Sequence, residues 1–289
     1  MKAFSYMVGE NDAFVGVMIE GKTTSFTKFD FSDEPFLFRK TIPSVMANVW
    51  DYSKQSETIA CLSWEEEKVT LFSAVDGIKR LSFSVGGGTV VKLFQDCIRV
   101  CGDGICVFDY SGRKIVKHDL RGSFVCDLGR RIITSRGKIV VLLDFAGKEI
   151  ASWKAEGLGI TSCAASADYI AAAESRGPIT MRNRNGELVW RSSSPEGYHP
   201  IHVGCGTNGE VFAIHGNLAS METSVVTRYE IDGIIKWEQA IDKCPAVAVF
   251  FDSIPGWVCG DLEILEVGSQ LRRRFHPGSV VLGNGHQAQ

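Results

Sequence analysis

The chain has 289 residues, of which 45% are hydrophobic and 22% are charged, and its formal net charge is −3. This composition fits a folded protein with a large core and excludes a disordered chain. The small net charge excludes a global electrostatic attraction to nucleic acid or to an anionic membrane. No apolar run is long enough for a membrane-spanning helix, and the nine cysteines are scattered, which predicts reduced and buried thiols. Because the first residues also lack a run of signal-peptide length, we expect a cytoplasmic protein that does not contact membranes.

One short phrase recurs along the chain. FDFSDE begins at Phe29, FDYSGRKI at Phe108 and LDFAGKEI at Leu143, and related turns occur elsewhere. Each turn lies between two short β-rich runs, which predicts a hairpin, and glycine or aspartate there supplies the backbone freedom that the turn needs. Successive turns are 35 to 47 residues apart. The anchors of the seven turns are Asp33, Gly77, Gly112, Gly147, Gly186, Gly233 and Gly268.

The complete repeat unit contains four strand-like runs. Two further apolar runs precede each hairpin, and the fourth unit reads SFVCD, RIITS, KIVVLLDF and KEIASW. Long helical patterns are absent. Seven such units predict an all-β chain that forms one domain, 1–289, a seven-bladed β-propeller with four antiparallel strands per blade. An eight-stranded barrel or a sandwich is the alternative. The expected blades are approximately 1–43, 44–86, 87–121, 122–156, 157–196, 197–243 and 244–280, followed by a tail at 281–289.

Tryptophans follow three of the turn glycines. In NRNGELVW and EIDGIIKW, Trp190 and Trp237 stand four residues after the glycine, and Trp153 stands six residues after its own. This pattern resembles the tryptophan-docking motif of quinoprotein-type propellers, in which the indole packs flat against the neighbouring blade. The resemblance covers the repeat pattern of the whole chain, but four units lack the tryptophan. Quinone-dependent members of that superfamily carry adjacent cysteines, which this chain lacks, so the resemblance implies an architecture and no cofactor.

A second resemblance is weaker. Trp50-Asp51 is similar to the dipeptide that marks WD-repeat propellers, but it lies in a first strand and occurs once. We interpret it as chance, which makes the chain a distant WD-repeat-like protein at most.

Several stretches imitate chemical motifs without the required context. GCGTNG at 204–209 satisfies G-x-G-x-x-G, but a strand, EVFAIH, follows where a phosphate site needs a helix, so we predict a plain turn. The cysteines of DCIRVCGDGIC do not form a complete zinc ligand set. In the repeat, Cys101 aligns with Ser135 and His215, which predicts a tight packing position. We therefore expect no catalytic residues, no metal and no cofactor.

Two long inserts separate Gly186 from Gly233. Ser192–Pro200 joins the fifth unit to the sixth, and Gly216–Ser224 joins the second and third strands of the sixth. Because successive strands alternate in direction, both inserts should emerge on one face of the disc, where function is usually placed. Neutral lengthening of two loops is the alternative. The candidate partner-binding residues are Tyr198, His199, His202, Met221 and Glu222.

A basic flank, the segment from Arg113 to Lys138, is the second feature that the repeat pattern does not explain. Eight Lys or Arg residues against two Asp residues lie between Arg113 and Lys138. Arg130, Arg131 and Arg136 could contact nucleic acid or an acidic partner. These residues come from turns on both faces and from an outer strand, so an ordinary solvated surface is favoured.

The sequence thus predicts a non-enzymatic interaction scaffold whose partner is another protein. One alternative is a propeller-type hydrolase or lyase with a site in the central channel, although first strands such as TVVKL and ITSCA offer few acids or bases. The other is a nucleic-acid-associated propeller that uses the basic flank, which is possible but not favoured.

Overall fold

The structure is a computed structural model, and all of its regular elements are β-strands. It describes residues 6–10, 13–20, 23–30, 38–43, 49–119, 126–127, 131–144, 146–206, 208–220, 223–241, 245–250, 255–259 and 264–266. Within these ranges the strands form six four-stranded sheets and one three-stranded sheet, with antiparallel pairing throughout. No helix in this part of the chain is long and apolar enough to cross a membrane.

The strands follow one another in sheet order. The first two sheets contain β1 (Tyr6–Glu10), β2 (Ala13–Glu20), β3 (Thr23–Asp30) and β4 (Phe38–Pro43), then β5 (Val49–Ser53), β6 (Thr58–Ser63), β7 (Lys68–Ser73) and β8 (Lys79–Ser84). The next two contain β9 (Val90–Leu93), β10 (Ile98–Cys101), β11 (Ile105–Phe108) and β12 (Lys114–His118), then β13 (Cys126–Asp127), β14 (Ile132–Arg136), β15 (Ile139–Leu143) and β16 (Glu149–Lys154). The last three contain β17 (Ile160–Ala165), β18 (Tyr169–Glu174), β19 (Ile179–Asn183) and β20 (Leu188–Ser192), then β21 (Tyr198–Cys205), β22 (Val211–Asn217), β23 (Ser224–Tyr229) and β24 (Ile235–Ile241), then β25 (Pro245–Phe250), β26 (Pro255–Cys259) and β27 (Ile264–Glu266).

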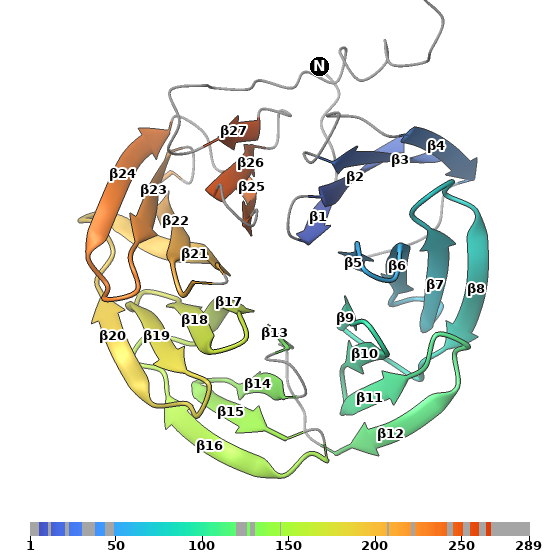
Figure 1. Cartoon of the computed structure of the whole chain (residues 1–289), viewed down its shortest axis with the longest axis horizontal. Helices are drawn as coiled ribbons and strands as arrows, with labels where there is room; N and C mark the ends of the chain where they lie inside the picture. Colours follow the sequence, from blue (N-terminus) through green and yellow to red (C-terminus); the bar gives the residue numbers. More distant parts are fainter. Residues whose placement is uncertain are drawn as a thin grey trace, which may run out of the picture.

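The sheets stand around a ring, each with its first strand innermost (Figure 1). Consecutive strands are hydrogen-bonded neighbours, so each sheet is a simple meander from the centre to the rim. Middle strands are buried along nearly their whole length, as in β6 and β10, whereas outer strands such as β8 and β12 are largely exposed. Continuous apolar runs mark the middle strands because both faces pack against neighbouring sheets. This radial arrangement confirms the all-β prediction and is the architecture of a β-propeller.

The repeated phrase forms the turn between the third and fourth strands, as predicted. Gly77, Gly112, Gly147, Gly186 and Gly233 all adopt positive φ, from 69° to 86°. An Asp or Asn side chain closes most of these turns. In the turn before β12, the Asp109 carboxylate accepts hydrogen bonds from the backbone N–H of Ser111 and Arg113, each at 3.0 Å. The predicted anchors Asp33 and Gly268 lie outside the described residues.

A ring from one sheet packs against the turn glycine of the next. A Cβ atom at Gly233 would lie 2.8 Å from the Trp190 ring. The indole Nε1 of Trp190 also donates to the Ile231 carbonyl, at 3.0 Å, so the predicted docking of this tryptophan is confirmed. Trp153 also packs beside the turn glycine of the next sheet, because a Cβ atom at Gly186 would lie 3.4 Å from its ring and 2.9 Å from Ala151.

Two further docked rings were missed, because they are not tryptophans. Phe83 packs against Gly112, and His118 packs against Gly147. Trp237 stacks on Phe212 of its own sheet, with ring centroids 6.3 Å apart, and its predicted neighbour turn lies outside the described residues. The docking position therefore requires a flat ring and does not require an indole.

Asp51 joins the first strands of two neighbouring sheets. Its buried carboxylate accepts hydrogen bonds from Lys92 Nζ, at 2.9 Å, and from the Leu93 backbone N–H, at 2.7 Å. The Trp50-Asp51 dipeptide that we interpreted as chance thus supplies a contact between sheets, although it does not occupy the WD-repeat position.

The stretches that imitate chemical motifs have structural roles. Cys101, Ser135 and His215 are all buried in the second halves of second strands, as the repeat alignment predicted. GCGTNG spans the end of β21 and the turn before β22, where the Gly206 N–H donates to the Glu210 carbonyl at 2.8 Å. The cysteines that the structure describes are free thiols.

Candidate functional site

The two inserts of the sixth sheet lie together on one face, as the strand alternation predicted. One connects β20 to β21 and the other connects β22 to β23. Their backbones are joined directly, because the Leu218 N–H donates to the Gly197 carbonyl at 3.0 Å. The two inserts are therefore in direct contact on this face.

The predicted extent of the first insert was wrong. Tyr198, His199 and Pro200 belong to strand β21, since its pairing with β22 continues through Tyr198↔Asn217 and His199↔Gly216. A bulge between Pro200 and His202 lets the strand continue to this edge. The true connection contains only residues 193–197, and the two aromatic candidates are held by a sheet, which positions side chains more rigidly than a loop does.

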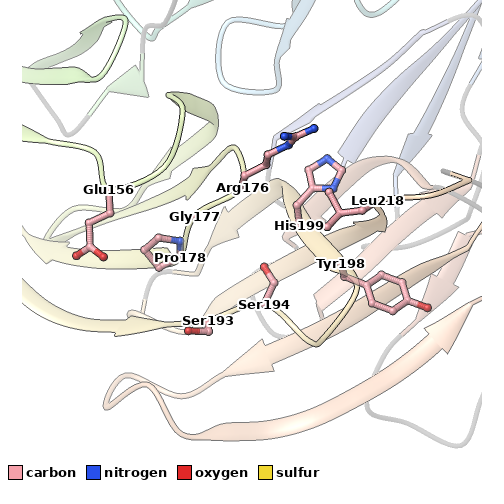
Figure 2. A pocket seen from close by; sticks show the side chains of 9 residues that line it. All are labelled: Glu156, Arg176, Gly177, Pro178, Ser193, Ser194, Tyr198, His199 and Leu218. Atoms are coloured by element: carbon pink, nitrogen blue, oxygen red, sulfur yellow. The ribbon is translucent and has the colours of Figure 1, made fainter.

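A pocket of about 620 Å³ opens on this face (Figure 2). Its walls come from the ends of three neighbouring sheets: the segment after β16, the β18–β19 turn, the β20–β21 connection, the start of β21 and the segment after β22. This volume falls within the range of ordinary ligand pockets. The lining residues are Glu156, Arg176, Gly177, Pro178, Ser193, Ser194, Tyr198, His199 and Leu218.

A buried carboxylate fixes one side of the pocket. Glu174, at the end of β18, is 1% exposed and accepts hydrogen bonds from the backbone N–H groups of Glu156, at 2.6 Å, and Gly157, at 2.9 Å. Gly157 and Gly177 touch through their backbones, and a Cβ atom on Gly157 would lie 2.4 Å from the Ser175 carbonyl oxygen. The linker after β16 and the β18–β19 turn are therefore locked together before any ligand binds.

Two histidines lie on the opposite side of the pocket. His215 is fully buried in β22, and its Nδ1 lies 3.0 Å from the Ser194 hydroxyl. Burial, with a smaller contribution from the neighbouring His199, lowers the pKa of His215 to about 4. His215 is thus neutral near pH 7 and holds the β20–β21 connection in place. His199 lines the pocket, and its buried Nδ1 atom has no hydrogen-bond partner.

One positive charge in the pocket is not neutralised. The Glu156 carboxylate lies 2.6 Å from the Arg191 guanidinium, so its charge is already paired. Arg176 is exposed in the β18–β19 turn with its backbone at φ 52°, and no described residue accepts a hydrogen bond from its guanidinium or forms an ion pair with it. In Figure 2 the side chains of Arg176 and His199 extend to the same side of the pocket.

The pocket also has an apolar border. Leu218 is 51% exposed at the start of the β22–β23 connection, and Pro178 lies in the β18–β19 turn. The Tyr198 ring is half-buried and points away from Arg176 (Figure 2). The site therefore combines one unpaired cation, hydroxyl and imidazole groups and an apolar rim. This mixture suits binding.

The predicted partner-binding residues divide into three groups. Tyr198 and His199 line the pocket, whereas His202 lies farther along β21 and does not. Burial lowers the pKa of His202, which fits a packed imidazole. Met221 and Glu222 lie outside the described residues. Sequence reasoning missed Arg176 and Glu156, because neither belongs to an insert.

The basic flank is described only in part. Arg131 Nη1 donates to the Arg184 carbonyl in the next sheet, so this side chain is engaged within the protein. Arg130 and the side chain of Arg136 lie outside the described residues. Elsewhere in this segment, Arg113 pairs with Asp109 at 3.1 Å and Lys117 with Asp119 at 3.7 Å.

Across the described ranges, no three His, Cys, Asp or Glu side chains converge on a position that could hold a metal ion. Burial raises the pKa of the Cys101 thiol to about 12, so this cysteine is a packing group and not a nucleophile.

Comparison with known proteins supports the fold and assigns the chain to no family. No protein-family model matches the chain, and no curated protein sequence matches it. The structure is similar to the crystal structure of Kluyvelomyces marxianus Hsv2, with a TM-score of 0.73, 14% sequence identity and coverage of 92% of both chains. It is also similar to KlHsv2 with loop 6CD replaced by a Gly-Ser linker, with a TM-score of 0.68, 14% identity and coverage of 90% of this chain and 88% of that one. At this identity the likeness supports the propeller fold alone.

Proposed function

We propose that the chain is a seven-bladed β-propeller that serves as a non-enzymatic protein-interaction scaffold in a cytoplasmic complex. Each described sheet corresponds to one blade of a single domain spanning 1–289. The partner is another protein, which binds on the face that carries the blade-six inserts. The observation that carries this proposal is the pocket formed where both inserts meet the β18–β19 turn.

The pocket differs from a catalytic site in its chemistry. Catalysis of proton transfer needs an acid and a base within hydrogen-bond reach of one reacting atom. Here the acid Glu156 is paired with Arg191, and His215 is turned toward Ser194. The Ser194 hydroxyl beside His215 is the possible nucleophile, but His215 Nε2 has no hydrogen-bond partner in the described part of the chain, so no carboxylate completes a Ser-His-acid triad. Arg176 and His199 can hold a ligand. A binding role therefore fits these residues better than a hydrolase or lyase.

The proposal is tested by shortening one insert. Residues 218–222, between β22 and β23, are replaced with an Asn-Gly turn, which suits a two-residue hairpin. The fold should persist, because the hydrogen-bonded strands are untouched. Partners are recovered from the native host by affinity purification and quantified by mass spectrometry. We expect at least one partner to be captured about tenfold less.

The matched control shortens the corresponding connection of another blade. Residues 64–67 join β6 to β7 in the second sheet, on the same face and at the same position in the repeat. Replacing them with the same turn should leave capture of that partner unchanged. Equal capture by wild-type protein and the 218–222 variant, with both folded, would sink the proposal.

A further inference from the structure

We propose that the pocket recognises an acidic side chain of an extended peptide segment in the partner protein, with an apolar residue next to it. This inference rests on the proposed function, because it specifies what the scaffold binds. The carboxylate is held by Arg176 and His199, and the apolar neighbour packs on Leu218.

The charged side chains of the pocket determine the sign of the charge that a ligand must carry. Its lining contains two charged side chains, Arg176 and Glu156. Arg191 neutralises Glu156 at 2.6 Å, and the nearby Glu174 carboxylate is buried and bonded to two backbone N–H groups. Arg176 is therefore the unpaired charge, and an anionic group is the complement that it lacks.

His199 adds a second, independent observation. It lines the pocket, and its imidazole can donate a hydrogen bond to a ligand there. A carboxylate can accept hydrogen bonds from a guanidinium and an imidazole at the same time, since it has two oxygens and about four acceptor positions. The same ligand group thus satisfies both side chains.

The shape of the site favours a peptide over a small anion. About 620 Å³ is far more space than a single carboxylate fills, and the cavity extends from Glu156 in one sheet to Leu218 two sheets away. The exposed Leu218 next to the charged part provides contact for an apolar side chain. Serine hydroxyls at 193 and 194 lie between these ends and can bond to a peptide backbone.

The rigid frame makes such recognition selective. The β18–β19 turn that carries Arg176 is fixed by the Gly157–Gly177 contact and by Glu174. His199 is fixed within β21, and Ser194 is held by His215. Groups held in this way lose little conformational freedom when a ligand binds, so more of the interaction energy appears as affinity.

The test is a selection from a phage library of random twelve-residue peptides against the folded full-length protein. Wild-type protein should enrich peptides with Asp or Glu adjacent to a large apolar residue. Affinities of the selected synthetic peptides are then measured by fluorescence anisotropy. Arg176→Ala should weaken binding about tenfold to a hundredfold, because a charge-assisted hydrogen-bonding partner is lost.

Reversing the charge at Arg176 tests whether this side chain contacts the peptide directly or only adds to the overall charge of the protein. Arg176→Glu should abolish binding of the acidic peptides and, in a fresh selection, enrich peptides with Lys or Arg. The control Arg184→Glu reverses an exposed arginine of the same sheet, on the opposite face in the β19–β20 turn, and should bind like wild-type protein. Circular dichroism confirms that both variants are folded.

Two results would overturn the inference. One is enrichment of peptides whose binding is indifferent to the charge at 176, and the other is no enrichment at all. If the 218–222 replacement still reduces capture of the native partner in either case, the scaffold function stands and only the acidic-peptide specificity fails. If capture is unaffected as well, both fail.

Discussion

The contact between the fifth and sixth sheets and the pocket at the edge of these sheets use polar groups in opposite ways. In the contact, Trp190 meets Gly233 and Tyr229, and its indole N–H is bonded to the Ile231 carbonyl. In the pocket, the exposed Arg176 guanidinium has no partner within the described part of the protein. Satisfied groups stabilise a fold, and unsatisfied groups at a surface are available to a ligand. The residues that recur in each repeat thus stabilise the fold, and residues that do not recur form the pocket.

The largest effect should come from removing a docked ring. Trp190→Ala should lower the free energy of unfolding by about 3–5 kcal/mol, since it deletes a buried indole that stacks on Tyr229 with centroids 5.2 Å apart. Trp237→Ala should cost less, because this ring is only half-buried. Denaturant melts of both variants measure the difference. A loss below about 1 kcal/mol for Trp190→Ala would show that the docking contact contributes little.

Acid should weaken the protein through His215. Its pKa is about 4 in the folded protein and about 6.5 when unfolded, so between these values the unfolded chain binds a proton that the native protein excludes. Stability should therefore fall as the pH drops from 6.5 to 4, by on the order of 3 kcal/mol from this group. His202, whose pKa is also lowered by burial, acts in the same direction.

The comparison for this prediction is His215→Asn, which removes the ionisable group. Urea melts from pH 7 to pH 4 should show a flatter dependence in the variant than in wild-type protein. Parallel curves for the two proteins would mean that His215 is protonated as easily in the folded state as in the unfolded one.

A smaller loss of stability, from replacing a turn glycine with alanine, distinguishes the cost of backbone strain from the cost of overlap with a ring. Gly233 and Gly197 both have positive φ, 83° and 80°, but a Cβ atom at Gly233 would meet the Trp190 ring at 2.8 Å, whereas one at Gly197 would meet nothing within 4 Å. Gly197→Ala should cost about 1 kcal/mol from the backbone alone. Gly233→Ala should cost about 1–3 kcal/mol more, because the overlap forces the ring to move. Equal losses of stability for the two variants in thermal melts would show that Gly233 is not needed for docking of the Trp190 ring.

The sequence predicted the architecture because the fold repeats. Five turn glycines with positive φ and the apolar middle strands follow from local patterns that recur along the chain. His118 and Phe83 were missed as docked rings because the position accepts any flat ring, while the pattern was defined by tryptophan. The extent of β21 was misjudged because Pro200 marks a loop by sequence, whereas cross-strand pairing continues past it.

The sequence predicted only part of the pocket lining. Tyr198 and His199 were found because long inserts indicate a functional face. Arg176 was missed because it lies in a short turn of ordinary length, and its significance comes from what surrounds it in space. Whether a charged side chain has a partner depends on contacts between segments far apart in the chain, as with Glu156 and Arg191, and no single-sequence pattern encodes these contacts.

We propose that partners bind at the pocket formed by the fourth, fifth and sixth sheets. Hydrogen–deuterium exchange tests it most directly, comparing the free protein with its complex with a partner recovered from the native host. We expect slowed exchange in peptides that cover 175–178, 193–199 and 218–223, and no change in 131–144. Protection confined to the segment that contains Arg131, with the pocket peptides unchanged, would contradict it and place the interaction on the basic flank.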